Sequence, residues 1–218
     1  MGGSALVIVI SPALLPGSPG FDGSGIDGGL YTEITRDARH APWLLNDTVS
    51  TWSAFGLALF AALMLTAWWL ARRSDSPMMA RALATPLVVA MVYGVDMVVR
   101  VAVREERPCR SIPRSFTLES CPAPGDWSFP SGHAVIAFAT AAALWLVERR
   151  LGAVAALAAA AMGASQVWIG AHYPHDVAAG ALTGVALAAP LTVLATRGAP
   201  WVARARKGRL RPLLVTAA

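Results

Sequence analysis

Long apolar runs separated by short polar segments dominate the chain from residue 49 onward. A membrane-spanning helix needs about 20 apolar residues, and five runs reach or approach that length, near 49–70, 82–99, 134–147, 151–169 and 177–196. The pattern predicts an all-α fold, a polytopic membrane bundle of five to six transmembrane helices. The sixth would be the stretch 5–15, which Pro12 interrupts and which could instead be a short helix or a signal-peptide core.

The remaining segments divide the chain into three regions. Region 1–48 holds the short apolar stretch, a loop at 16–29 rich in Gly, Pro, Ser and Asp, and a mixed segment whose Tyr31 and Trp43 suit a membrane interface. Region 49–196 is the expected membrane core. Region 197–218 is a basic tail, which we expect to be cytoplasmic and to lie on acidic lipids.

Composition supports a membrane protein. Of 218 residues, 56% are hydrophobic and only 14% are charged, whereas about 25% is usual in soluble domains. The net charge of +5 comes from arginine, since Lys207 is the only lysine. A basic chain can bind nucleic acid, acidic lipid or a phosphate substrate. The arginines are split between a tail and one loop without a groove pattern, which argues against nucleic acid.

The basic loops predict the orientation. Three arginine-bearing segments share one face of a five-span path, around Arg72, around Arg149, and in the tail. The positive-inside rule makes that face cytoplasmic, so the polar segment 100–132 and the turn 170–176 face outward. The arginines of segment 100–132 break the rule, and anion binding would explain them. We therefore expect a site on the extracytoplasmic side of the membrane.

The first of three polar signals is Arg100 followed after six residues by Arg107 and Pro108. A spacing of seven is two helical turns, which would put both arginines on one helix face. Two guanidinium groups can clamp a phosphate and stabilise its transition state. Taken alone, each arginine could equally be a membrane-edge anchor.

The second signal is Pro130-Ser131-Gly132-His133, at the start of an apolar run. Ser131 can cap the helix, whose free N–H groups attract an anion. Gly132 would let the anion approach the backbone, and His133 would reach a phosphate oxygen. The alternative is a capping loop with an incidental interfacial histidine.

The third signal is SQVWIGAHYPHD at 165–176. His172 and Asp176 lie four apart, so a helical backbone would place the carboxylate under the imidazole and make its other nitrogen a better nucleophile. Pro174 suits the first turn of such a helix. The alternative is a polar cap in which His172 satisfies a backbone carbonyl. His175 points elsewhere and is a weaker candidate.

The three signals together resemble the type 2 phosphatidic acid phosphatase superfamily, whose signature is Lys-x6-Arg-Pro, Pro-Ser-Gly-His and Ser-Arg-x5-His-x3-Asp. The resemblance covers about 49–196. It implies that His172 is the nucleophile that becomes phosphohistidine, Asp176 its orienting acid and His133 the general acid. The phosphate ligands it implies are Arg100, Arg107, Ser131 and Gly132. It implies no cofactor and no metal.

Two positions depart from this signature. Arg100 replaces lysine, which keeps the charge, and Gln166 replaces the arginine of the third motif. Gln166 can still donate a hydrogen bond to phosphate but adds no charge. Arg104 or Arg110 could supply the missing charge.

The only two cysteines, Cys109 and Cys121, lie in the same polar segment. A zinc site would need more ligands. The pair could form a disulfide if the segment faces an oxidising compartment, and the sequence leaves the pairing open.

The run from Tyr31 into the first span is similar to bacterial undecaprenyl diphosphate phosphatases. The resemblance thus implies a lipid phosphate substrate within membrane lipids, with phosphatidylglycerophosphate or phosphatidic acid as alternatives. A different class of protein, an inactive lipid-phosphate binder or transporter, is supported by the replacement of the signature arginine by Gln166. Soluble acid phosphatases and haloperoxidases of the superfamily lack five spans. The lipid chain length and the oligomeric state are left open.

Overall fold

The computed structural model describes residues 20–215. Regular structure in this part is helical, apart from an isolated bridge between Phe21 and Glu105. The elements in chain order are α1 (Ser24–His40), α2 (Trp43–Phe55), α3 (Leu57–Ala71), α4 (Ser76–Val103), α5 (Pro108–Ser111), α6 (Gly132–Val147), α7 (Arg149–Trp168), α8 (Pro174–Leu194), the 3-10 helix η2 (Ala195–Gly198), α9 (Ala199–Ala205) and α10 (Arg211–Leu214).

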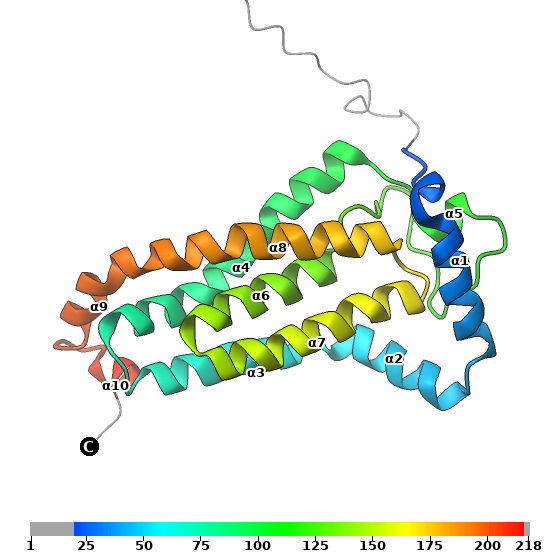
Figure 1. Ribbon diagram of the computed structural model, residues 1–218. Helices are drawn as coiled ribbons and strands as arrows, with labels where there is room; N and C mark the ends of the chain where they lie inside the picture. Colours follow the sequence, from blue (N-terminus) through cyan, green and yellow to red (C-terminus); the bar gives the residue numbers. More distant parts are fainter. Residues whose placement is uncertain (1–19, 216–218) are drawn as a thin grey trace, which may run out of the picture.

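Helix α6 is the centre of the bundle, with α4, α7 and α8 packed around it (Figure 1). Small residues let the helices approach closely, as is common between membrane helices. A Cβ at Gly180 would lie 2.7 Å from the Ser131 carbonyl oxygen, and one at Gly184 would lie 2.8 Å from that of Val135. These two glycines of α8 therefore press it against the backbone of α6.

Judged by length and composition, the described helices provide fewer membrane spans than the sequence predicts. Among residues 20–215, three helices are long and apolar enough to cross a membrane, α4, α7 and α8 with its continuation to Ala205, and the bent pair α2 and α3 makes a fourth. The third predicted run, near 134–147, corresponds to α6, which has only 16 residues. The chain is thus a multi-pass helical membrane protein, while a count of five or six is not confirmed. The predicted stretch 5–15 lies outside the described residues.

The first predicted span is broken. Helices α2 and α3 meet at Gly56 with a bend of 51°. A Cβ at Gly56 would lie 2.5 Å from the Trp52 carbonyl oxygen and 2.7 Å from the Met162 side chain of α7. Only a glycine fits this close approach, and its apolar neighbours hide the break from a hydropathy pattern.

The predicted loop 16–29 is wrong over its described second half, because α1 begins at Ser24. The Asp22 carboxylate accepts from the Ser24 N–H at 2.9 Å, which offsets the high glycine content at the helix start. Helix α1 deviates from helical angles at Asp27 (φ −144°). That carboxylate instead accepts from the backbone N–H of His175 at 2.7 Å, so α1 is fastened to the start of α8.

The two ends of the bundle differ in character. At one end, Arg72 donates to the Pro212 carbonyl oxygen at 2.7 Å and Arg206 donates to that of Ser74 at 2.8 Å, which joins the tail to the α3–α4 loop. At the other end, α1, α5 and the polar connection between α4 and α6 cover the helix termini (Figure 1). The three predicted motifs lie at this second end.

Candidate active site

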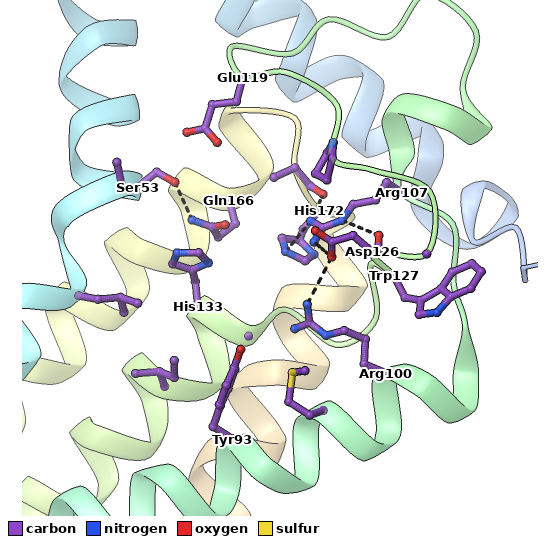
Figure 2. A pocket seen from close by; sticks show the side chains of 18 of the residues that line it. Ser53, Tyr93, Arg100, Arg107, Glu119, Asp126, Trp127, His133, Gln166 and His172 are labelled. Atoms are coloured by element: carbon purple, nitrogen blue, oxygen red, sulfur yellow. Dashed lines mark hydrogen bonds and ion pairs between the residues drawn. The ribbon is translucent and has the colours of Figure 1, made fainter.

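A cavity of about 710 Å³ opens at the end of the bundle covered by α1. Its walls come from α2, α3, α4, α6, α7 and two connecting segments, as Figure 2 shows. Six of the residues predicted from sequence line it, namely Arg100, Arg107, Gly132, His133, Gln166 and His172. The fold thus brings together three motifs that are far apart in the chain.

His172 lies in the tight turn between α7 and α8. Its backbone N–H donates to the Gln166 carbonyl oxygen at 3.2 Å, which folds the turn back on the end of α7. Gly170 has φ +82°, a conformation that side chains disfavour, and a Cβ there would lie 2.7 Å from the Phe116 carbonyl oxygen. The turn therefore needs a glycine at this position to place His172 at the cavity wall.

Asp176 lies behind the imidazole, as the spacing predicts, although not for the predicted reason. Residues 172 and 173 are not helical, because α8 begins at Pro174. Asp176 is the third residue of that helix, and its Oδ2 reaches back to accept from the Tyr173 N–H at 2.9 Å. The same oxygen lies 3.4 Å from Nδ1 of His172. A helix-capping carboxylate therefore orients the imidazole.

The neighbours of His172 determine its tautomer and its charge. Arginine can only donate, so the contact of 3.1 Å from Arg107 Nη1 makes Nε2 of His172 the acceptor and leaves the proton on Nδ1, toward Asp176. Burial lowers the pKa of His172 to about 4, whereas the hydrogen bond from His172 to Asp176 acts to raise it; the positive charge of Arg107 adds to the lowering. The imidazole is therefore neutral near pH 7, and the lone pair of its Nε2 is directed at Arg107.

The two predicted phosphate-binding arginines both line the cavity, but not from one helix face. Helix α4 ends at Val103, and Arg107 lies beyond it in extended backbone. Arg107 donates to the Ala171 carbonyl oxygen at 3.0 Å as well as to His172. Arg100 remains in the last turn of α4 and donates to the Pro130 carbonyl oxygen at 3.0 Å. The prediction that both arginines lie on one helix face is wrong. Both nevertheless line the same cavity.

The Pro-Ser-Gly-His motif begins α6. Ser131 is the N-cap residue, but its hydroxyl forms no cap hydrogen bond and, among the described residues, has no partner although it is buried. The predicted cap is therefore wrong. Gly132 makes room for a side chain rather than only for an anion, because a Cβ there would lie 2.7 Å from Arg100 Nη2. His133 lines the cavity across from His172 (Figure 2).

Gln166 also faces the cavity, where its Nε2 donates to Ser53 Oγ of α2 at 3.0 Å. The two arginines predicted to compensate for it have other partners. Arg104 Nε donates to the Val101 carbonyl oxygen at 3.2 Å, and Arg110 contacts the Pro122 carbonyl oxygen and Glu106. Within the described chain neither side chain lines the cavity, so the geometry does not support compensation.

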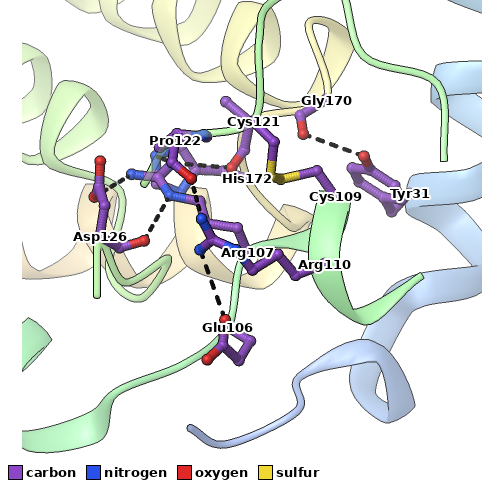
Figure 3. Close-up of a disulfide and its surroundings, with 11 residues drawn as sticks. Tyr31, Glu106, Arg107, Cys109, Arg110, Cys121, Pro122, Asp126, Gly170 and His172 are labelled. Atoms are coloured by element: carbon purple, nitrogen blue, oxygen red, sulfur yellow. Dashed lines mark hydrogen bonds and ion pairs between the residues drawn. A yellow bond between two sulfur atoms is a disulfide. The ribbon is translucent and has the colours of Figure 1, made fainter. Parts of the chain in front are cut away.

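Cys109 and Cys121 are joined by a disulfide (Figure 3). The bond closes a loop between residues 109 and 121. Arg107 lies just before this loop and Asp126 just after it, and both line the cavity. Arg110 Nη2 contacts the Pro122 carbonyl oxygen beside the disulfide. The polar connection is therefore held in shape next to the phosphate-binding arginines.

Several site residues escaped the sequence analysis. Ser128 is fully buried, and its hydroxyl donates to Asp176 Oδ2 and lies 3.4 Å from His172 Nδ1. Asp96 accepts from Arg100, and Asp126 accepts from Arg107. An acidic residue inside an apolar run, such as Asp96, is itself a functional signal. Ser128 and Asp126 carry no comparable signal, because they lie in a polar segment.

His175 supports the site from behind. Its Nδ1 lies 2.7 Å from Asp27 Oδ1 of α1, and its Nε2 lies 2.8 Å from Glu105 Oε1. Burial raises the pKa of Glu105. This arrangement connects α1, the end of α4 and the start of α8, and it agrees with a supporting rather than catalytic position for His175.

Comparison with known proteins now gives the family. The PAP2 superfamily model matches residues 81–198. The chain belongs to the PAP2 superfamily. Two curated relatives are similar to it. The bacitracin transport permease protein BcrC of Bacillus licheniformis is 33% identical over 58% of this chain and 60% of the relative. An undecaprenyl-diphosphatase of Sulfolobus acidocaldarius is 34% identical over 47% of this chain and 48% of the relative. The matches thus span about half to three fifths of the length of these relatives.

Two solved structures share the fold. LpxE of Aquifex aeolicus superposes with a TM-score of 0.56 at 22% identity, over 77% of this chain and 94% of LpxE. The first transmembrane PAP2-type phosphatidylglycerolphosphate phosphatase from Bacillus subtilis gives a TM-score of 0.55 at 20% identity, over 78% and 84% of the two chains. The fold is therefore that of PAP2 membrane proteins.

Proposed function

We propose that this PAP2 protein is a membrane lipid phosphatase that hydrolyses a terminal phosphate through a phosphohistidine on His172. The observation that carries the proposal is the environment of His172. Its Nδ1 proton faces Asp176, and its Nε2 accepts from the guanidinium of Arg107 at 3.1 Å. The oxygens of an incoming phosphate would take over this donor and free the Nε2 lone pair for attack. A neutral, oriented imidazole beside a phosphate-binding cation is what nucleophilic attack on phosphorus requires.

The first step forms the covalent intermediate. Nε2 of His172 attacks the terminal phosphorus, the bond from phosphorus to the leaving oxygen breaks, and His133 donates a proton to that oxygen. The imidazolium formed is stabilised by Asp176, which the Ser128 hydroxyl and the Tyr173 N–H hold in place. Arg100 and Arg107 absorb the charge on the phosphoryl oxygens, and Gln166 offers an uncharged hydrogen-bonding group.

The second step regenerates the enzyme. Water attacks the phosphorus, the phosphorus–nitrogen bond breaks, and inorganic phosphate leaves. His133, which lost its proton in the first step, takes one from the water as it attacks. His133 thus acts as the acid in the first step and as the base in the second, while His172 is first the nucleophile and then the leaving group.

The shape of the cavity favours a lipid substrate. Its polar wall carries the arginines and histidines, whereas apolar side chains from several helices line the rest, namely Ala54, Leu57, Met97, Val101 and Ile136. Leu57 begins α3 just after the bend, and Met97 belongs to α4. A lipid tail can therefore lie toward the membrane between these helices while its phosphate contacts the arginines.

We favour a polyprenyl diphosphate, most specifically undecaprenyl diphosphate, because a relative at 34% identity bears that activity in its name. Phosphatidylglycerophosphate and phosphatidic acid are the alternatives. We place the site on the extracytoplasmic side of a bacterial plasma membrane. This orientation is supported by the basic loops and tail at the opposite end of the bundle and by a disulfide beside the site.

The test compares phosphate release by wild type and His172→Ala in detergent, with chelator present. The substrates are undecaprenyl diphosphate, phosphatidylglycerophosphate and phosphatidic acid. We expect chelator-resistant release by wild type that the variant loses, with the fastest substrate identifying the lipid. If lipid phosphates bind but no substrate releases phosphate, the protein is instead an inactive binder, and Gln166 is the residue that distinguishes it from active members of the superfamily.

A further inference from the structure

A single carboxylate bridges the two arginines assigned to the phosphate. Asp126 Oδ1 lies 2.8 Å from Arg107 Nη2 and 3.9 Å from Arg100 Nη1, and the residue lines the cavity (Figure 2). The backbone carbonyl oxygen of Asp126 also accepts from Arg107 Nε at 3.2 Å. An acidic side chain thus holds the guanidinium groups that a phosphate would need.

A second carboxylate, that of Asp96, contacts Arg100 in a different way. Asp96 lies one turn earlier on α4, is fully buried, and accepts from Arg100 Nη2 at 3.0 Å. Because Asp96 is buried within α4, its carboxylate cannot move from Arg100 to water. The side chain of Asp126, by contrast, is 45% exposed and belongs to the polar connection before α6. Only Asp126 can turn from the arginines to water.

We propose that Asp126 is a resident counter-ion that the phosphate of the substrate displaces, whereas Asp96 stays paired with Arg100 throughout. The inference rests on the proposed function, since it concerns the same phosphate site. Before phosphate binds, the two guanidinium groups and the two carboxylates that contact them cancel in charge, and His172 is neutral. A phosphate that arrives while Asp126 remains would leave excess negative charge among buried groups, which is costly.

Gln166 makes the exchange necessary. A third cation at this position would offset part of the added charge, so that the carboxylate and the phosphate could remain together. Gln166 instead contributes a neutral amide bound to Ser53 Oγ. Within the described chain, the cavity is lined by two arginines and no lysine. Release of Asp126 into water is then the way to keep the site near charge balance.

The proposal predicts the direction of a substitution. Asp126→Asn keeps the size of the side chain, an oxygen that can accept from Arg107, and the backbone contact, but removes the charge. We expect the dissociation constant of inorganic phosphate to fall about threefold to tenfold, because a weaker competitor leaves the arginines more easily. If Asp126 instead positioned the arginines for phosphate, the constant would rise.

The experiment is a ³¹P NMR titration of detergent-solubilised full-length protein with inorganic phosphate and no lipid. Glu119→Gln is the matched control, because Glu119 lines the same cavity and, in the described chain, forms no ion pair with either arginine. We expect it to change the dissociation constant by less than about twofold, since salt screens the more distant charge. Asp126→Ser is the second variant if Asp126→Asn does not fold.

The outcomes separate the two proposals. Tighter phosphate binding in Asp126→Asn, with little change in Glu119→Gln, supports the exchange, even if no lipid is hydrolysed and the proposed function fails. Unchanged or weaker binding in Asp126→Asn overturns the exchange while hydrolysis by wild type can stand. An equal gain in both variants would show a general charge effect and would overturn the specific role of Asp126. No binding to wild type also overturns the exchange.

Discussion

Arg107 Nη1 lies 3.1 Å from Nε2 of His172, and this contact brings together residues that are 65 positions apart in the chain. Because a guanidinium only donates, the contact reports the tautomer of the imidazole and marks the nitrogen that faces the cavity. The same guanidinium is positioned to receive the oxygens of a phosphoryl group bound to that nitrogen. The nucleophile and its electrostatic partner are therefore assembled before substrate arrives.

The carboxylate behind His172 should matter more than the hydroxyl that holds it. Asp176→Asn removes the negative charge that stabilises the imidazolium and disturbs the tautomer, so we expect kcat to fall about 10²–10⁴-fold. Ser128→Ala leaves the carboxylate with its contact to the Tyr173 N–H, and we expect a loss of about tenfold. Steady-state kinetics on the preferred lipid would check both. A larger loss in Ser128→Ala than in Asp176→Asn would contradict this assignment.

The charge state of His172 gives a prediction in pH. Burial lowers the pKa of this imidazole from 6.5 to about 4, so between these values the unfolded chain binds a proton that the folded chain does not. His172 therefore reduces the stability of the folded state as pH falls through this window, while its nucleophilic form persists. Titration of ¹⁵N-histidine-labelled protein by NMR, with His172→Ala for assignment, should show a midpoint well below 6.5. A midpoint at or above 6.5 would refute the neutral nucleophile.

The contact between α8 and α6 should tolerate no added methyl group at Gly180. A Cβ there would lie 2.7 Å from the Ser131 carbonyl oxygen, and Ser131 N–H donates to the Asp176 carbonyl oxygen at 3.1 Å. We expect Gly180→Ala to destabilise the protein by about 1–3 kcal/mol and to lower kcat by about tenfold or more. Thermal unfolding in detergent and phosphate release would measure the two effects.

Gly94→Ala on α4 is the control for this prediction, because in the described chain its added Cβ would have no heavy atom within 4 Å beyond its chain neighbours and the adjacent backbone of its own helix. In a helix interior the exchange of Gly for Ala is usually stabilising by about 0.5–1 kcal/mol. Equal behaviour of the two variants would mean that helix contact at Gly180 does not position the site.

The disulfide should affect substrate binding more than chemistry. Cys109 and Cys121 are 12 positions apart, and closing a loop of this size stabilises a fold by about 3 kcal/mol. Arg107 and Asp126 lie on either side of the closed loop, so the double variant Cys109→Ser with Cys121→Ser should lose stability and show a raised KM with a smaller change in kcat. The variant should also become insensitive to reductant. An unchanged KM would show that the connection keeps its shape without the bond.

Much of the site could be predicted from sequence because its chemistry is carried by short motifs. His172, His133 and the two arginines follow from residue type and spacing, and the structure places all four around one cavity. The backbone geometry that brings these residues together was less predictable. Asp176 reaches His172 as a helix cap, and Arg107 lies beyond the end of α4, because chain direction changes at positions such as Arg104, whose φ is +55°.

The partners of these residues could not be predicted, because they depend on how distant segments pack. Ser128 contacts Asp176, and Asp27 contacts His175, only once α1 and the polar connection have docked on α8. The break at Gly56 is likewise hidden, since a hydropathy pattern does not register a bend between two apolar helices. The lengths of the apolar runs therefore indicated the bundle, including the short α6, but not the bend between α2 and α3.

The most direct test of a phosphohistidine on His172 is to trap the phosphoenzyme. Wild type and His172→Ala would be mixed with a lipid diphosphate carrying ³²P in its terminal phosphate, quenched in alkali within milliseconds, and mapped by peptide mass spectrometry. We predict base-stable label on His172 in wild type and none in the variant. Turnover by wild type without label on His172, or label retained in His172→Ala, would contradict this prediction.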